Sequence, residues 1–316
     1  LDPLSKVAVG NYIGFLLEQG GLDEAKHELE RTREILPDVY GYFERLLKSM
    51  DGQWADDVLA LLEALKDDPK NVGIRNFLAY RLCALGLVPD ALAATAPENI
   101  PYLLPEMGRP QEAIAIQERL LAEAERTDTN VVGERRGLGL ILAITDDYAR
   151  ARPILEEMWE HSEHQRGPYF ELLDAAILII IRRATGDNSG IDELLNLMRD
   201  EVRQSRAAGH STNIISSVDF DEGLTLYLAG EHQEGLELIA KAVQDGYWMS
   251  MDIPILQAIY DDPGFATIRE VQETRQARES KRFLEVVCGD NPYAEVWQPI
   301  EETCETYLGD GNNQGL

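Results

Sequence analysis

One sequence pattern recurs along this chain of 316 residues: an apolar run, a glycine, a short polar segment, a small residue five positions after the glycine, and a second, amphipathic run. The turns of successive copies are 32, 34, 22, 38, 40 and 44 residues apart. Such self-similarity is the signature of an architecture made of stacked repeats. The clear copies are Gly20/Ala25, Gly86/Ala91, Gly108/Ala113 and Gly230/Gly235, and the degenerate copies are Gly52/Asp57, Asp146/Ala151 and Gly186/Ile191.

Each part of this sequence pattern has a physical role in a helical hairpin. Glycine adopts the left-handed conformation that ends the first helix, and the small residue lets the second helix cross close to the first. Apolar residues at helical spacing supply the stripe that packs on neighbouring helices. With no sustained alternation of period two, the pattern predicts an all-α fold with negligible strand content. Buried alanines are expected where the helices cross: Ala25, Ala91, Ala113 and Ala151.

Prolines mark the junctions between successive copies of the pattern: Pro3, Pro37 and Pro69 are spaced by 34 and 32 residues. Over residues 4–247 the pattern resembles the tetratricopeptide repeat (TPR) family, which implies an α-α superhelix, a TPR-like solenoid. Leu1–Ser5 resembles the end of a preceding repeat, so the native array is expected to extend upstream. The first helix of the fourth pair should be curtailed near Pro101–Met107. Helix pairs are expected at 6–36, 40–67, 72–96, 99–126, 132–162, 169–207 and 214–245.

The C-terminal part departs from the repeat, which divides the chain into an array (1–248) and a C-terminal region (249–316). Proline suits the first turn of a helix, so Asp262–Pro263 predicts the start of one that runs from Phe265 to about Leu284. This helix resembles the cap that such arrays need over their last apolar face. The remainder is predicted to be an irregular tail, with 309–316 disordered.

Three cysteines are too few for a disulfide scaffold. Cys83 lies within a helical pattern and is expected in the core. Cys288 and Cys304 are expected to lie within about 7 Å of each other, Cα to Cα. Two states stay open for them: a bridge, which would stabilise its loop by about 3 kcal/mol, or two free thiols in a reducing cytosol.

The charge balance of 29 basic against 57 acidic residues gives a net charge of −28. Such a chain repels phosphate backbones and anionic membranes, so neither direct nucleic-acid binding nor membrane insertion is expected. A basic peptide or protein would be attracted, although solubility alone is an equal explanation. The most apolar run, Ile177–Ile181, is far shorter than the ~20 residues of a membrane span. The bacterial cytoplasm and the periplasm both stay open as the compartment.

Catalytic motifs are missing: there is no P-loop, GxSxG elbow, HExxH or CxxC pair. The chain is therefore predicted not to be an enzyme and to carry no cofactor. His161 and His164 are spaced to share a helix face, where they could hold a metal ion. No third ligand lies nearby in the sequence, so they are interpreted as surface histidines, and no metal site is predicted.

In the TPR family the first helix of each pair lines a groove in which partner peptides lie. An asparagine there can hold a peptide backbone, and an arginine can fork onto a carboxylate. The alternative for the aromatic residues, Phe220 and Tyr227, is packing between helices. No lysine occupies a groove position, so clamping of a C-terminal carboxylate is not implied. Carried over by register, the candidate groove residues are Asn76, Tyr80, Arg136, Arg183, Phe220 and Tyr227.

The C-terminal stretches DPGFATI and RFLEVVCGDNPYAEVWQP are similar to the end of bacterial multidomain regulators. In those proteins a TPR array follows a class III nucleotide cyclase or a winged-helix DNA-binding domain. The resemblance implies a regulatory module for protein or peptide binding within a larger signal-transduction protein. The alternatives are a stand-alone scaffold or assembly chaperone, and an enzyme with a site between the array and the tail.

Overall fold

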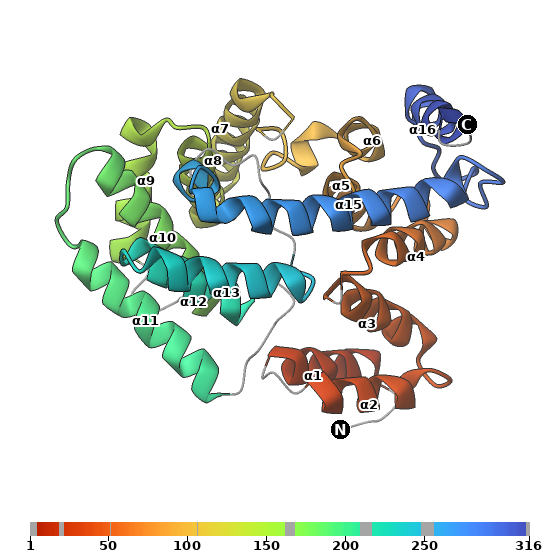
Figure 1. Ribbon diagram of the computed structural model, residues 1–316, viewed down its shortest axis with the longest axis horizontal. Coiled ribbons are helices and arrows are strands. Elements are labelled where there is room, and N and C mark those ends of the chain that lie inside the picture. The colour runs from red at the N-terminus through yellow and green to blue at the C-terminus, as the bar shows by residue number, and fades with distance from the viewer. Residues whose placement is uncertain are drawn as a thin grey trace.

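The computed structural model describes residues 5–18, 22–50, 52–105, 107–161, 168–208, 217–247 and 256–313. Within these ranges all regular structure is helical and no β-strand occurs. The predicted all-α class and the predicted helical majority are therefore confirmed. Figure 1 shows the helices following one another around a curved array, with the C-terminal helices laid across it. The expected boundary at residue 248 falls outside the described ranges, as does Leu1–Leu4.

Most helices of the array pack on the next one along the chain, and we group the helices in the pairs that the sequence predicted. The fourth pair lacks a regular first helix: a 3-10 turn, η1 (Pro97–Asn99), and further turns lead into α7 (Pro110–Thr127), as predicted from the short repeat there. The other pairs are α1 (Lys6–Glu18) with α2 (Leu22–Thr32), α3 (Pro37–Met50) with α4 (Trp54–Asp67), α5 (Val72–Ala84) with α6 (Val88–Ala94), α8 (Val131–Ile144) with α9 (Tyr148–His161), α10 (Pro168–Ala184) with α11 (Ile191–Ala207), and α12 (Val218–Leu228) with α13 (His232–Gln244).

The hairpin turns take the predicted left-handed conformation. In α5 the N–H of Gly86 donates to the carbonyl of Cys83, and that of Leu87 donates to Leu82, both at 2.8 Å. This is the Schellman arrangement, which satisfies the last carbonyls of a helix. Asp146, with φ of +63°, replaces the glycine after α8, and Gly20 lies outside the described residues. The described turn glycines, Gly52, Gly86, Gly108, Gly186 and Gly230, have φ between +71° and +93°.

Small residues bring the paired helices together. The side chains of Ala25, Ala91, Ala113 and Ala151 are fully buried, which confirms that prediction. In α12 and α13 glycines allow a close approach, since a Cβ added to Gly235 would lie 2.6 Å from the carbonyl oxygen of Gly223. Any larger residue would push these two helices apart.

The C-terminal helices are α14 (Gln257–Tyr260), the 3-10 turn η3 (Pro263–Phe265), α15 (Ala266–Val287) and α16 (Glu301–Asn313). The turn η3 and the start of α15 pack in the same core as α12 and α13, through Phe265 and Ile268 respectively. The other end of α15 packs with α4, α5 and α6, through Phe283, Leu284 and Val287. The predicted capping helix therefore also spans the array from the last pair to the second and third pairs (Figure 1).

The prediction of an irregular tail needs correction. Gly289–Ile300 lack helical structure, but α16 follows and includes 309–313, which were expected to be disordered. The carboxylate of Asp90, on α6, accepts hydrogen bonds from the N–H of Ile300 (2.8 Å) and the hydroxyl of Thr303 (2.6 Å). Because a carboxylate at a helix N-terminus satisfies otherwise unpaired donors, Asp90 anchors α16 from a distant part of the chain.

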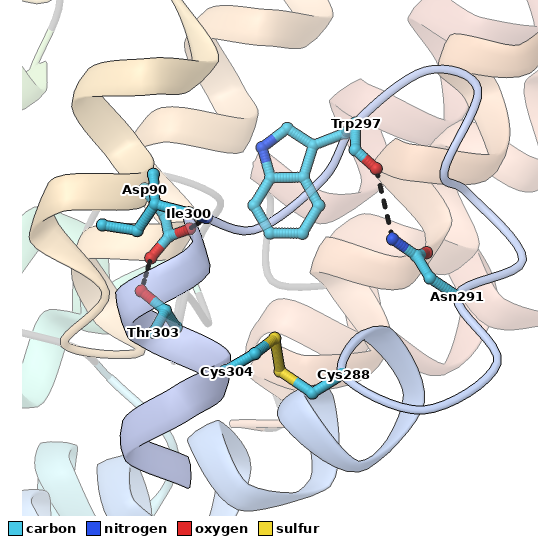
Figure 2. Close-up of a disulfide and its surroundings, with 7 residues drawn as sticks. All are labelled: Asp90, Cys288, Asn291, Trp297, Ile300, Thr303 and Cys304. Atoms are coloured by element: carbon cyan, nitrogen blue, oxygen red, sulfur yellow. Dashed lines mark hydrogen bonds between the residues drawn. A yellow bond between two sulfur atoms is a disulfide. The ribbon is translucent and has the colours of Figure 1, made fainter. Parts of the chain in front are cut away.

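A disulfide joins Cys288, at the end of α15, to Cys304 in α16, with a Cα–Cα distance of 5.4 Å (Figure 2). The expected proximity is confirmed, and the structure has the bridged state. The ring of Trp297 is buried with Phe283 of α15, their centroids 5.6 Å apart. Cys83 is buried in α5 as predicted.

Candidate partner-binding surface

The two candidate groove arginines link the first helices of successive pairs. Arg136 on α8 forks onto Asp174 on α10, with Nε–Oδ2 at 3.0 Å and Nη2–Oδ1 at 2.6 Å. Arg183 at the end of α10 donates to the carbonyl of Leu228, the last residue of α12, at 2.5 Å. The guanidinium of Arg136, which was predicted to bind a partner's carboxylate, therefore binds a carboxylate of the protein itself.

The candidate aromatic residues of α12 are packed between helices. Phe220 and Tyr227 are each only 8% exposed. Phe220 lies 4.8 Å from the ring of Tyr247, and Tyr227 stacks on His232 at 4.3 Å. The Tyr227 hydroxyl donates to Asp262 at 3.2 Å; burial and this hydrogen bond raise the pKa of Tyr227 to about 12. These two rings hold α12, α13 and the start of the C-terminal region together.

The candidates on α5 are partly accessible. The Asn76 side-chain oxygen accepts a hydrogen bond from the hydroxyl of Thr95 at 2.7 Å, which ties α5 to the end of α6. Tyr80 is half-buried against the core of α4, α5 and α6. Directly after Asn76 the chain carries one of two surface aromatic residues that share a single arginine.

Those surface residues are Tyr42 on α3 and Phe77 on α5, which are 48% and 50% exposed. The Arg45 guanidinium lies against both rings, with its carbon 5.2 Å from the Tyr42 centroid and 5.6 Å from the Phe77 centroid. Arg45 itself is 11% exposed. A cation held over two rings fixes their positions by cation–π attraction. We call Tyr42, Arg45 and Phe77 the α3–α5 aromatic surface.

A buried carboxylate holds Arg45 in place. Asp57 is fully buried and pairs with Arg45 (Nη1–Oδ1, 3.2 Å) and with Arg81 of α5 (Nε–Oδ2, 2.7 Å). Asp57 occupies the position five residues after the turn residue, where most of the other hairpins carry a small residue. Since a buried charge is tolerated only when it is paired, Asp57 fixes both arginines between α3, α4 and α5. The ring spacing in the aromatic surface thus depends on a residue that no partner touches.

No family model and no curated protein matches this chain. Within the described ranges, no group of three or more His, Cys, Asp or Glu side chains is placed to hold a metal ion. His164, one of the two histidines considered for metal binding, lies outside those ranges. None of the helices that the structure describes is long and apolar enough to cross a membrane.

Sequence reasoning missed Tyr42, although its register contained the signal. Tyr42 lies ten residues before the turn at Gly52. The candidates Asn76, Arg136 and Phe220 lie ten residues before their own turns at Gly86, Asp146 and Gly230. Applying the same register to the second pair would have selected Tyr42, and Phe77 is the next residue after Asn76.

Proposed function

We propose that this protein is an interaction module that binds a segment of a partner protein on the α3–α5 aromatic surface. The observation that carries the proposal is the pair of half-exposed rings, Tyr42 and Phe77, fixed around Arg45. Binding hot spots are enriched in tyrosine and arginine, and rigid aromatic side chains lose little entropy on binding. The two rings, each about half exposed, offer a partner apolar contact area beside a cation.

The proposed scaffold is a TPR-like superhelix in which the first helices of the pairs face the partner. The α3–α5 aromatic surface lies on two such first helices, next to the candidates Asn76 and Tyr80. The net charge of −28 favours a basic partner, chiefly by accelerating its association. The resemblance of the C-terminal stretches to bacterial regulators supports a regulatory role within a larger protein; a stand-alone scaffold would use the same surface.

The test compares three immobilised proteins in their capture of partners from a bacterial lysate: wild type, Tyr42→Ala/Phe77→Ala, and the control Val132→Ala. Val132 is 67% exposed and lies on α8, away from the aromatic surface. We expect a partner that wild type and the control retain and that the double variant loses, with melting temperatures alike. A partner that all three retain equally would place the binding site elsewhere.

A further inference from the structure

A cleft lies between α13 and the start of α15. Its volume is about 410 Å³, within the usual size range for sites that take a small ligand or a side chain. Its apolar lining includes Leu236 and Ala240 of α13 and Ile268 of α15. Leu236 and Ile268 are buried, and Ala240 is half-buried.

The chain enters α15 very close to α13. A Cβ added to Gly264 would lie 2.8 Å from a methyl carbon of Leu236, so the glycine is what allows this approach. The cleft lies beside this approach, between α13 and the first turn of α15.

The rim of the cleft carries negative charge. Glu237 of α13 and Asp262 lie among its lining residues, and none of the lining residues in the described structure is lysine or arginine. Asp262 is held in place because it accepts hydrogen bonds from the N–H of Gly264 (2.8 Å) and the hydroxyl of Tyr227 (3.2 Å). The cleft therefore combines an apolar lining with an acidic rim, in which Asp262 is held in place.

We propose that this cleft binds a bulky apolar side chain of a basic partner segment, whose flanking lysines or arginines pair with Glu237 and Asp262. The apolar side chain would cover Leu236, Ala240 and Ile268, and the cations would match both the rim and the net charge of −28. An acidic segment would be rejected by the same two carboxylates. This inference rests on the proposed function and adds a second, separate anchor point for the partner.

The test uses a fluorescein-labelled, amidated peptide, Lys-Lys-Trp-Lys-Lys, with binding followed by fluorescence anisotropy. We expect Ala240→Trp, which fills the cleft, to weaken binding more than about tenfold, because most binding energy resides in the buried anchor. Glu237→Lys should weaken it by about three- to tenfold through charge repulsion. The control Glu285→Lys makes the same charge change at an exposed position near the other end of α15 and should leave binding nearly unchanged.

Other outcomes would overturn the proposal. A peptide with glycine in place of tryptophan that binds equally well would show attraction by net charge alone. Binding unaffected by Ala240→Trp and Glu237→Lys but lost in Tyr42→Ala/Phe77→Ala would place the peptide on the α3–α5 aromatic surface; the proposed function would then stand without the cleft. Self-association that Ala240→Trp abolishes would show that a second copy of the chain is the occupant.

Discussion

At the scale of single residues, three buried carboxylates form ion pairs or accept hydrogen bonds from groups on other helices. Asp57 pairs with two arginines, Asp90 anchors the start of α16, and Glu279 of α15 accepts a hydrogen bond from the N–H of Ala55 at 3.2 Å. None of the three is more than 1% exposed. A buried charge destabilises a protein unless its partners are present, so each carboxylate is sensitive to the loss of its partners.

Replacing Asp57 tests the first of these sites. Asp57→Ala leaves Arg45 and Arg81 without their shared carboxylate, and we expect the free energy of unfolding to fall by about 3 kcal/mol or more. The control is the neighbouring Asp56→Ala, which breaks a more exposed pair with Arg282 and should cost less than about 1 kcal/mol. Urea denaturation measures both; equal midpoints for the two variants would contradict the role given to Asp57.

The crossing alanines give a second prediction at this scale. Ala91→Leu forces extra volume into a fully buried position and should destabilise the protein by about 1–3 kcal/mol. Ala93→Leu is the matched control, because Ala93 lies on the exposed face of the same short helix, α6. Indistinguishable denaturation midpoints for the two variants would show that the repeat register is wrong.

At the scale of elements, α15 supplies side chains that complete the ends of array helices. Arg275 donates to the carbonyls of Val243 and, at 2.7 Å, Gln244, the last two residues of α13. Gln276 donates to the last carbonyl of α5, that of Ala84, at 3.1 Å. Glu279 reaches the start of α4, where the local cap residue, Gln53, makes no side-chain cap. Free helix ends need such partners.

Glu279→Ala should therefore expose the start of α4. We expect a loss of about 1–3 kcal/mol, typical of an unsatisfied buried donor, and faster amide hydrogen exchange at Ala55 in particular. Glu285→Ala, on the exposed face of α15, is the control and should leave both quantities unchanged. Exchange at Ala55 that does not respond to Glu279→Ala would mean that this cap contributes nothing.

The disulfide gives a second prediction for an element. Cys304→Ser releases α16 from α15 and leaves the two hydrogen bonds to Asp90 and the packing of Tyr307 to hold the helix. We expect amide exchange in α16 to quicken while α8–α13 keep their protection, because the bridge closes a short loop and stabilises it by about 3 kcal/mol. Wild type in reducing buffer should behave in the same way. Unchanged protection of α16 in both samples would assign its docking to Asp90 and Tyr307 without the bridge.

At the scale of the whole molecule, local patterns predicted the helical class, the pair boundaries, the left-handed turns and the capping helix. Each of these leaves a signal within about one repeat, such as Gly86 followed by Ala91. The reach of α15 leaves no such signal, because Phe283 and Val287 pack on helices about 200 residues earlier. The role of Asp90 also leaves no local sequence signal, because its partners Ile300 and Thr303 are 210 and 213 residues away. The aromatic surface was missed because the register was not applied to the second pair.

The span of α15 also bears on the order in which the chain can fold. The partner of the Ala55 amide, Glu279, is 224 residues further along, so α4 leaves the ribosome long before its cap is synthesised. Pairs such as α12 with α13 need only neighbouring sequence, and local contacts of that kind form quickly. α15 can dock only after the helices on which it packs, α13 at one end and α4 to α6 at the other, have formed. Its docking is therefore a late step that joins separately formed hairpins into one cooperative unit.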